Sequence, residues 1–209
     1  MRNVVRIISA VGAAIFAALP VGAQTETAQI DKPIKTLAPL CNMVTGERNY
    51  RPTLADYTRG NKAVLLVFVA NRCGVTWQYA DKIAALQKRY VAPGKVAIIG
   101  VHSNFEETDA ELMTELKKRK LNFPVLDDKP AQEMATYFGA TVTPYFVVID
   151  GKGVLRYKGA FDKMGGSVAE SKRPQYLRPA LDAILTGKPV AKKTVRALGC
   201  EIARREKTP

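Results

Sequence analysis

The sequence is poor in the residues that build metal centres and disulfide frameworks. It has three cysteines and one histidine in 209 residues. His102 and the cysteines are dispersed along the chain, whereas structural zinc sites take their ligands from closely spaced pairs. An odd number of cysteines also leaves at least one thiol unpaired in a monomer. The sequence therefore argues against a metal site and directs attention to a free thiol.

Acidic residues are scarce relative to basic ones. The chain has 19 acidic and 32 basic residues, with a formal net charge of +13. The basic excess gathers at Lys117–Lys120, at Lys192, Lys193 and Arg196, and at Arg204, Arg205 and Lys207. No aromatic residues are interleaved with these clusters, so we do not expect nucleic acid as a partner. We interpret them as a solvated helix end and a loose tail. Attraction to an anionic membrane surface is the alternative.

Long apolar runs are absent except at the N-terminus. Arg2 and Arg6 precede an apolar segment, 7–21, which ends in the small-residue site 21–23. This pattern is typical of a secretory signal peptide. The alternative is a membrane anchor, but that needs about 20 apolar residues, and the run here is shorter and broken by proline. We expect cleavage near Ala23 and a periplasmic or secreted product.

The rest of the chain has the length of one domain. A chain of this size buries about 70% of its unfolded surface, so it needs no disulfide framework. Residues 24–36 are polar and predict a flexible lead-in. Residues 37–186 predict an α/β domain that opens with a hairpin extension at 37–51, and residues 187–209 form a basic tail.

Apolar runs predict the centre of a sheet. Ala63–Val69, Val96–Val101 and Tyr145–Ile149 read as strands buried on both faces. A short helix after Thr53, a short strand at 123–126, helices at 75–90, 108–120, 130–138 and 176–185, and a hairpin at 145–158 complete the pattern. Alternating strands and helices predict a parallel core, and the late hairpin adds antiparallel strands. We expect a central mixed sheet flanked by helices.

Cys73 lies between the strand 63–69 and the helix that follows it. At an unperturbed pKa of about 8.5, only about 3% of a thiol is ionised at neutral pH. We expect Arg72, the Thr76 hydroxyl and backbone amides of the first helical turn to lower this pKa. Gly74 is expected to let another chain approach. The alternative is a buried, inert cysteine that packs as a small hydrophobic residue.

The step Thr143–Pro144 leads directly into the strand that begins at Tyr145. Proline donates no hydrogen bond to a sheet and belongs at the start of a strand. A cis bond here would turn the backbone of Thr143 toward the thiol, where an extended peptide could pair with it. We predict Thr143 and Pro144 as a platform for binding substrate.

These segments resemble the redoxin branch of the thioredoxin superfamily, related to the alkyl hydroperoxide reductase and thiol-specific antioxidant group. The resemblance covers most of residues 37–202 and lies in Val67–Gly74, Gly139–Pro144, Val148–Gly153, Leu155–Gly159, Leu185–Val190 and Leu198–Ile202. It implies a thioredoxin-like fold, a catalytic role for Cys73 and no bound cofactor.

The chain departs from the two best-known patterns of that superfamily. Thioredoxins carry Cys-x-x-Cys, but Thr76 stands where the second cysteine would be. Peroxiredoxins carry Pro-x-x-x-Thr-x-x-Cys, and those first two places hold Leu66 and Ala70. Ala70 also removes the option of a cysteine three residues before Cys73. What remains is a single-thiol site, and the departures argue against efficient peroxide reduction.

Another cysteine would have to resolve an oxidised Cys73. Cys200, in the tail, and Cys41, in the hairpin extension, are the candidates. An equal alternative is a Cys41–Cys200 bridge that ties down both ends of the domain and leaves Cys73 as the odd thiol. Bridged Cα atoms must lie within about 7 Å, so the sequence leaves both pairings open.

The resulting prediction is an exported thiol-based oxidoreductase. Cys73 would attack a disulfide or slowly reduce a peroxide, with protein or small-molecule thiols and disulfides as partners and an external thiol as reductant. The alternative is a non-catalytic module that binds extended peptides at Thr143 and Pro144. We interpret His102 as a polar strand end rather than a proton donor or copper ligand.

Overall fold

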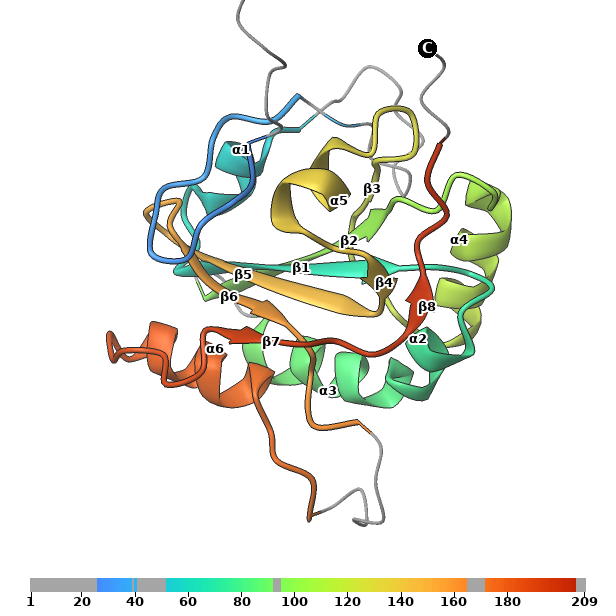
Figure 1. Cartoon of the computed structure of the whole chain (residues 1–209). Helices are drawn as coiled ribbons and strands as arrows, with labels where there is room; N and C mark the ends of the chain where they lie inside the picture. The colour runs from blue at the N-terminus through green and yellow to red at the C-terminus, as the bar shows by residue number, and fades with distance from the viewer. Residues whose placement is uncertain (1–25, 39, 41–51, 92–94, 165–171, 206–209) are drawn as a thin grey trace, which may run out of the picture.

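A six-stranded mixed sheet forms the centre of the protein. The computed structural model describes residues 26–38, 40, 52–91, 95–164 and 172–205 (Figure 1). The strand order is β3-β2-β1-β5-β6-β7. Three of the inner strands are the predicted apolar runs, β1 (Ala63–Val69), β2 (Val96–His102) and β5 (Tyr145–Asp150). The fourth inner strand is β6 (Leu155–Gly159), and the edge strands are β3 (Val125–Asp127) and β7 (Thr194–Val195). The predicted α/β class is confirmed.

Strand directions follow the predicted order of elements. β1 runs parallel to β2, and β2 parallel to β3. β5 runs antiparallel to both β1 and β6, its partner in the predicted hairpin. Every residue of β1 is buried, because helices cover both faces of this strand. The sheet is therefore parallel on one side of β1 and antiparallel on the other.

Helices form a layer on each face of the sheet. α3 (Ala80–Tyr90), α4 (Asp109–Lys118) and α6 (Leu177–Leu185) pack with Leu65 and Val67 of β1. α1 (Leu54–Thr58) and α5 (Glu133–Phe138) pack with Leu66 and Phe68 on the opposite face (Figure 1). Successive side chains of a strand point to opposite faces of the sheet, so β1 contributes to a hydrophobic core on each face. In the described part of the chain, no helix is long and apolar enough to cross a membrane.

Most helix ends lie close to their predicted places. Thr53 and Thr108 each close a capping box, and α5 ends at Gly139 in the left-handed region. The single helix predicted for 75–90 is wrong, because the chain breaks at Tyr79 into α2 (Gly74–Gln78) and α3. The break brings the Tyr79 hydroxyl to the buried carboxylate of Asp162, at 2.5 Å.

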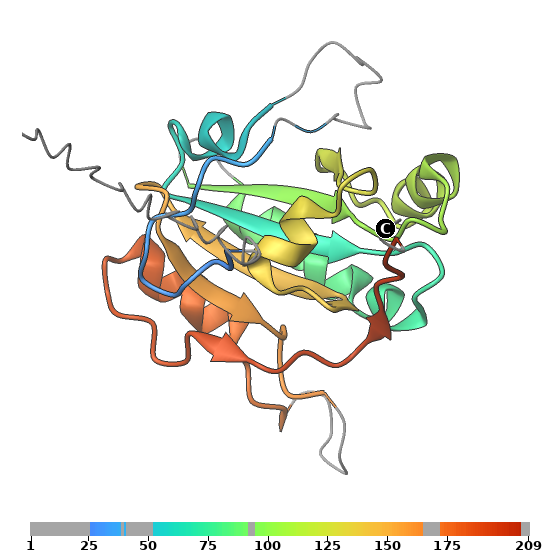
Figure 2. The ribbon, with the colours of Figure 1, turned by 45° about the horizontal axis from the view of Figure 1, so that its top comes forward.

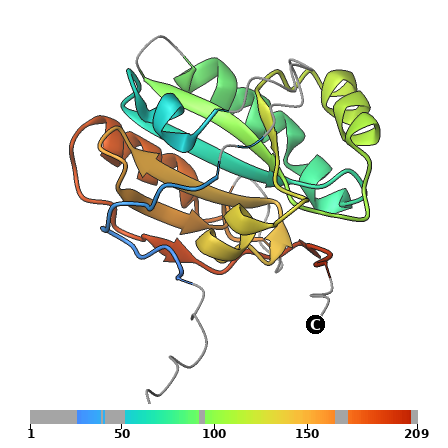
Figure 3. The same cartoon turned by 90° about the horizontal axis from the view of Figure 1, so that it is seen from above.

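The N-terminal segment lies along the turn between β5 and β6 (Figure 3). Asp31 donates its N–H to the carbonyl of Leu155, and Pro33 forms a bridge with Val154. The expectation of a flexible lead-in is therefore wrong for residues 28–34. The hairpin predicted for 37–51 falls mostly on 39 and 41–51, outside the described residues.

The C-terminal segment also belongs to the fold. After β7 it continues to the start of β5 and forms β8 (Cys200–Glu201), which pairs antiparallel with β4 (Val142–Thr143) (Figure 2). Ile202 is buried against the α5 side of the core, and the Arg204 guanidinium donates to the Ala140 carbonyl at 2.6 Å. The expectation of a loose tail is wrong for residues 194–205, because backbone pairing and Ile202 fix them.

A candidate thiol site at the end of the central strand

Cys73 lies at the junction of β1 and α2. It is the N-cap residue of α2, and its sulfur accepts the Thr76 N–H at 3.4 Å. The thiol donates to the Thr143 carbonyl at 3.0 Å. The Thr143–Pro144 bond is cis. The fold thus brings the two predicted parts of the site together, and the Cys73 residue is only 1% exposed.

The tail brings a second sulfur to this place. Cys200 lies directly opposite Thr143 in the β4–β8 pair, and it is close enough to Cys73 to change the pKa of that thiol. Both cysteines are free thiols. Of the two candidate partners, the structure therefore places Cys200 beside Cys73. Cys41 lies outside the described residues.

The two thiols differ in acidity. Burial by itself raises the pKa of Cys73, but the nearby Cys200 thiol, the Thr143 and Thr76 side chains and the Thr76 N–H outweigh burial and lower that pKa below its ordinary value. Burial raises the pKa of Cys200, and the nearby Cys73 and its charge raise it further. Cys73 therefore ionises first, and the Cys200 thiol beside it favours the Cys73 thiolate.

Two buried hydroxyls contribute to this site. Within the described residues, the hydroxyls of Thr76 and Thr143 have no hydrogen-bond partner, although both side chains lie close enough to Cys73 to affect its pKa. The expected bond from the Thr76 hydroxyl is thus not formed to the thiol. A hydroxyl can rotate its hydrogen, so both groups are available to a thiolate.

Two neighbours of Cys73 differ from their predicted roles. The Arg72 guanidinium pairs with Glu111 at 3.6 Å and is 60% exposed, and Arg72 is not among the groups that lower the pKa of Cys73. A Cβ atom on Gly74 would meet no atom within 4 Å. Close approach to the thiol therefore does not require glycine at that position.

Glu107 supports the site and was missed in the sequence. Its buried carboxylate accepts the N–H of Arg72 at 2.8 Å and also that of Asn71. Burial raises the pKa of Glu107, but hydrogen bonds with His102, Arg72 and Asn71 lower it overall. The carboxylate therefore fixes the loop before Cys73.

His102 is fully buried, and its Nε2 lies 3.3 Å from the Glu107 carboxylate. We expected a polar residue at the end of the strand, and the structure gives it the role of a partner to Glu107. No feature of the sequence marks this contact, because neither residue belongs to a motif. Within the described residues, no group of three or more suitable side chains could hold a metal ion.

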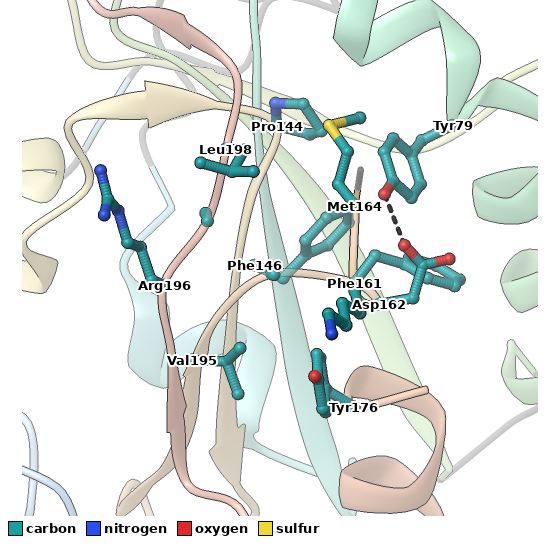
Figure 4. A pocket seen from close by; sticks show the side chains of 13 residues that line it. Tyr79, Pro144, Phe146, Phe161, Asp162, Met164, Tyr176, Val195, Arg196 and Leu198 are labelled. Carbon is teal, nitrogen blue, oxygen red and sulfur yellow. Dashed lines mark hydrogen bonds between the residues drawn. The ribbon is translucent and has the colours of Figure 1, made fainter. Parts of the chain in front are cut away.

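A cavity of about 260 Å³ adjoins the site on the side of Pro144 (Figure 4). Aromatic side chains of β5 and of the segment after β6, and apolar side chains of the tail, line it, among them Phe146, Phe161, Val195 and Leu198. Asp162 lies in its wall and binds the Lys82 ammonium at 2.7 Å. The tail therefore spans an incompletely filled space just before it reaches Cys200.

A comparison with models of protein families identifies the family of the chain. The model of the AhpC/TSA family matches residues 35–158, which is more than half of the sequence. The chain belongs to the AhpC/TSA family. The matched residues of this redoxin family include Cys73, Thr143 and Pro144, and they end before the tail. A comparison with curated proteins finds no match.

Solved structures with the same fold include a hypothetical protein from Sinorhizobium meliloti 1021. It is 28% identical with a TM-score of 0.71, over 87% of this chain and 98% of that chain. An uncharacterized conserved protein from Geobacillus kaustophilus is 23% identical with a TM-score of 0.71, over 88% and 95%. A putative thiol:disulfide interchange protein DsbE from Chlorobium tepidum is 21% identical with a TM-score of 0.58, over 76% and 99%. The predicted thioredoxin-like fold is confirmed.

Proposed function

We propose that this redoxin is a thiol–disulfide oxidoreductase that uses Cys73 as nucleophile and Cys200 as resolving thiol. The observation that carries the proposal is the position of Cys200, directly opposite the Thr143 whose carbonyl accepts a hydrogen bond from the Cys73 thiol, and close enough to Cys73 to change its pKa. The lowered pKa of Cys73 supports its role as the attacking group, because the thiolate is the nucleophilic form. The proposed site therefore has two thiols, although the local motif has one.

The proposed reaction has two exchange steps. The Cys73 thiolate attacks a sulfur of the substrate disulfide, forming a mixed disulfide while the other substrate sulfur leaves as a thiolate. The Cys200 thiolate then attacks the Cys73 sulfur, forming a Cys73–Cys200 disulfide and releasing the fully reduced substrate. Two electrons pass to the substrate, and an external thiol must reduce the protein again. When the external thiol attacks the Cys73–Cys200 disulfide, Cys73 is the better leaving group, because its pKa is lower than that of Cys200.

We propose Thr143 and Pro144 as the place where an extended substrate chain binds. The backbone of Thr143 already contacts the Cys73 thiol, so a chain paired with Thr143 has its own sulfur near the nucleophile.

Peroxides are the weaker substrate candidates. Residue 70 is a buried alanine and offers no hydroxyl where peroxiredoxins use threonine.

Export is part of the same proposal. Arg2, Arg6 and the apolar segment 7–21 support a signal peptide that is cleaved near Ala23. Disulfides form and persist outside the reducing cytosol. A protein that cycles between a dithiol and a disulfide suits that compartment.

Single-turnover exchange tests this function. The reduced chain, beginning at Gln24, is mixed with a disulfide-bonded peptide, and both products are followed by mass spectrometry. We expect the wild type to reduce the peptide, Cys73→Ser to be inactive, and Cys200→Ser to stop at a mixed disulfide on Cys73. Cys41→Ser is the matched control and should behave as wild type.

Three outcomes would contradict this assignment. If Cys73→Ser still reduced the peptide, Cys73 would not be the nucleophile. A mixed disulfide that accumulates in Cys41→Ser would make Cys41 the resolving thiol. Binding of the peptide to every variant without electron transfer would favour the non-catalytic module.

A further inference from the structure

Strand β8 already occupies the backbone edge that the proposed function gives to a substrate chain. Cys200 is paired with Thr143, and Ile202 donates its N–H to the Thr141 carbonyl at 2.9 Å. The same tail segment lies beside the N-terminus of α2 (Figure 1), where Cys73 is almost completely buried. An external chain therefore cannot pair with this edge while the tail remains in place.

Gly199 fits against β4 more closely than any other residue type could. A Cβ atom at this position would lie 2.1 Å from the carbonyl oxygen of Thr143 and 2.8 Å from its carbonyl carbon. Both are backbone atoms next to the cis bond, so neither can move aside as a flexible side chain would. A chain that follows the path of the tail must therefore have glycine directly before its cysteine.

We propose that β8 is a built-in occupant of the substrate site, and that the site acts on extended chains in which glycine immediately precedes the disulfide-bonded cysteine. The inference rests on the proposed exchange function of Cys73. A chain of this kind takes the path of Gly199 and Cys200 along Thr143 and brings its sulfur to the position of the Cys200 sulfur. Tail and substrate thus exclude each other.

The contacts of the tail allow its middle part to leave while its ends stay attached. A cavity of about 260 Å³ lies beneath residues 195–198 (Figure 4), so these residues lack packing contacts on the side that faces the cavity. At one end, β7 is paired with β6. At the other end, the Gln132 side chain donates to the Ala203 carbonyl at 2.8 Å and accepts the Arg205 N–H at 2.9 Å.

These anchors keep Cys200 close during the reaction. The substrate chain enters as the segment 196–201 lifts, and Cys73 forms a mixed disulfide with the substrate cysteine while the other substrate sulfur leaves as a thiolate. The tail then pairs with Thr143 again, and the Cys200 thiolate attacks the Cys73 sulfur and expels the substrate cysteine as a thiolate. Because Cys200 is tethered, this step is intramolecular and has a high effective concentration.

Two peptides test the requirement for glycine on the wild-type protein. The first has the sequence of residues 197–203, and the second has alanine in place of its glycine. Each cysteine carries a thiopyridine group, so that attack by Cys73 releases pyridinethione. We expect the glycine peptide to react about tenfold faster with the reduced chain, because the added methyl group meets backbone atoms. Equal rates would overturn the specificity.

A variant tests the role of the tail as occupant. Gly199→Ala should push β8 away from Thr143 and speed the reaction of Cys73 with the glycine peptide about tenfold over wild type. Ala191→Val, which enlarges an exposed residue before β7, is the control and should react as wild type. An unchanged rate in Gly199→Ala would overturn the inference. The peptide comparison does not depend on the folding of this variant.

Dithiodipyridine separates this inference from the proposed function, because it is a small disulfide with no peptide chain. If Cys73 reacts with dithiodipyridine but does not distinguish the peptides or respond to Gly199→Ala, only the further inference fails. If Cys73 reacts with no disulfide in either protein, the proposed function fails as well.

Discussion

Cys200 lies directly opposite Thr143 in an antiparallel strand pair, and the carbonyl of that same Thr143 accepts a hydrogen bond from Cys73 at 3.0 Å. The backbone of Thr143 thus contacts two cysteines that are far apart in the sequence. The chain lacks the local Cys-x-x-Cys pair, because Thr76 occupies the second place. The tail brings a second sulfur to this place because it continues from β7 to pair with β4.

The acidity of Cys73 depends on its neighbour. Cys200→Ala removes the neighbouring thiol that most lowers the pKa of Cys73, so the pKa of Cys73 should rise. The measurement is the pH dependence of Cys73 alkylation, followed by mass spectrometry in wild type and variant. In the wild type, Cys73 should be alkylated at a lower pH than Cys200, whose pKa is raised. The opposite order would refute the assignment of nucleophile and resolving thiol.

Glu107 should stabilise the fold only when it is ionised. Its pKa in the folded state is lowered from the ordinary value of 4.5, so its contribution is complete above that pH and is lost as the pH falls through the lowered pKa. At about pH 7, Glu107→Gln should lower the free energy of unfolding by about 2 kcal/mol, because hydrogen bonds to a charged group are lost. Urea unfolding at about pH 7 and about pH 4 should show the smaller difference at the lower pH.

The neighbouring acid provides the control for that experiment. Glu106 is exposed, and Glu106→Gln should change the free energy of unfolding by less than about 0.5 kcal/mol. A difference between wild type and Glu107→Gln that grows as the pH falls would contradict a stabilising carboxylate at this position.

Gln132 should hold the end of the tail. Its amide joins the Ser103 carbonyl at 2.6 Å to the backbone of Ala203 and Arg205. Gln132→Gly removes the amide and suits the left-handed backbone at this residue, where φ is 50°. We expect trypsin to cleave after Arg196 several times faster in this variant than in wild type, because the anchored end is released.

The control for tail release is Gln87→Ala, which removes an amide hydrogen bond to the Asn122 carbonyl far from the tail. Trypsin should cleave this variant at the wild-type rate. Equal cleavage in Gln132→Gly and wild type would mean that the amide does not anchor the tail.

The sequence predicted the sheet well because its inner strands carry a continuous signal. Ala63–Val69 is apolar at every position and is buried at every position. The helix starts after Thr53 and at 108 were predictable for a similar reason, since the capping box that forms each start lies within four consecutive residues. Signals of this kind are local and survive without tertiary information.

The missed parts of the site depend on contacts between distant residues. β4, β7 and β8 have two residues each, which is too short for any periodic pattern. Glu107 acts through the backbone of Asn71 and Arg72, and no spacing rule connects these positions. The position of Cys200 beside Cys73 follows from the path of the tail, and no local pattern predicts that path. From the sequence alone, a Cys73–Cys200 pair was therefore one of several alternatives.

Peptide mapping without reduction tests the central claim most directly. The chain beginning at Gln24 is oxidised mildly, digested, and analysed by mass spectrometry for linked cysteine peptides. The account predicts one linkage, between the peptides that contain Cys73 and Cys200, and its disappearance after treatment with a thiol reductant. A Cys41–Cys200 linkage with Cys73 left as a free thiol would contradict it.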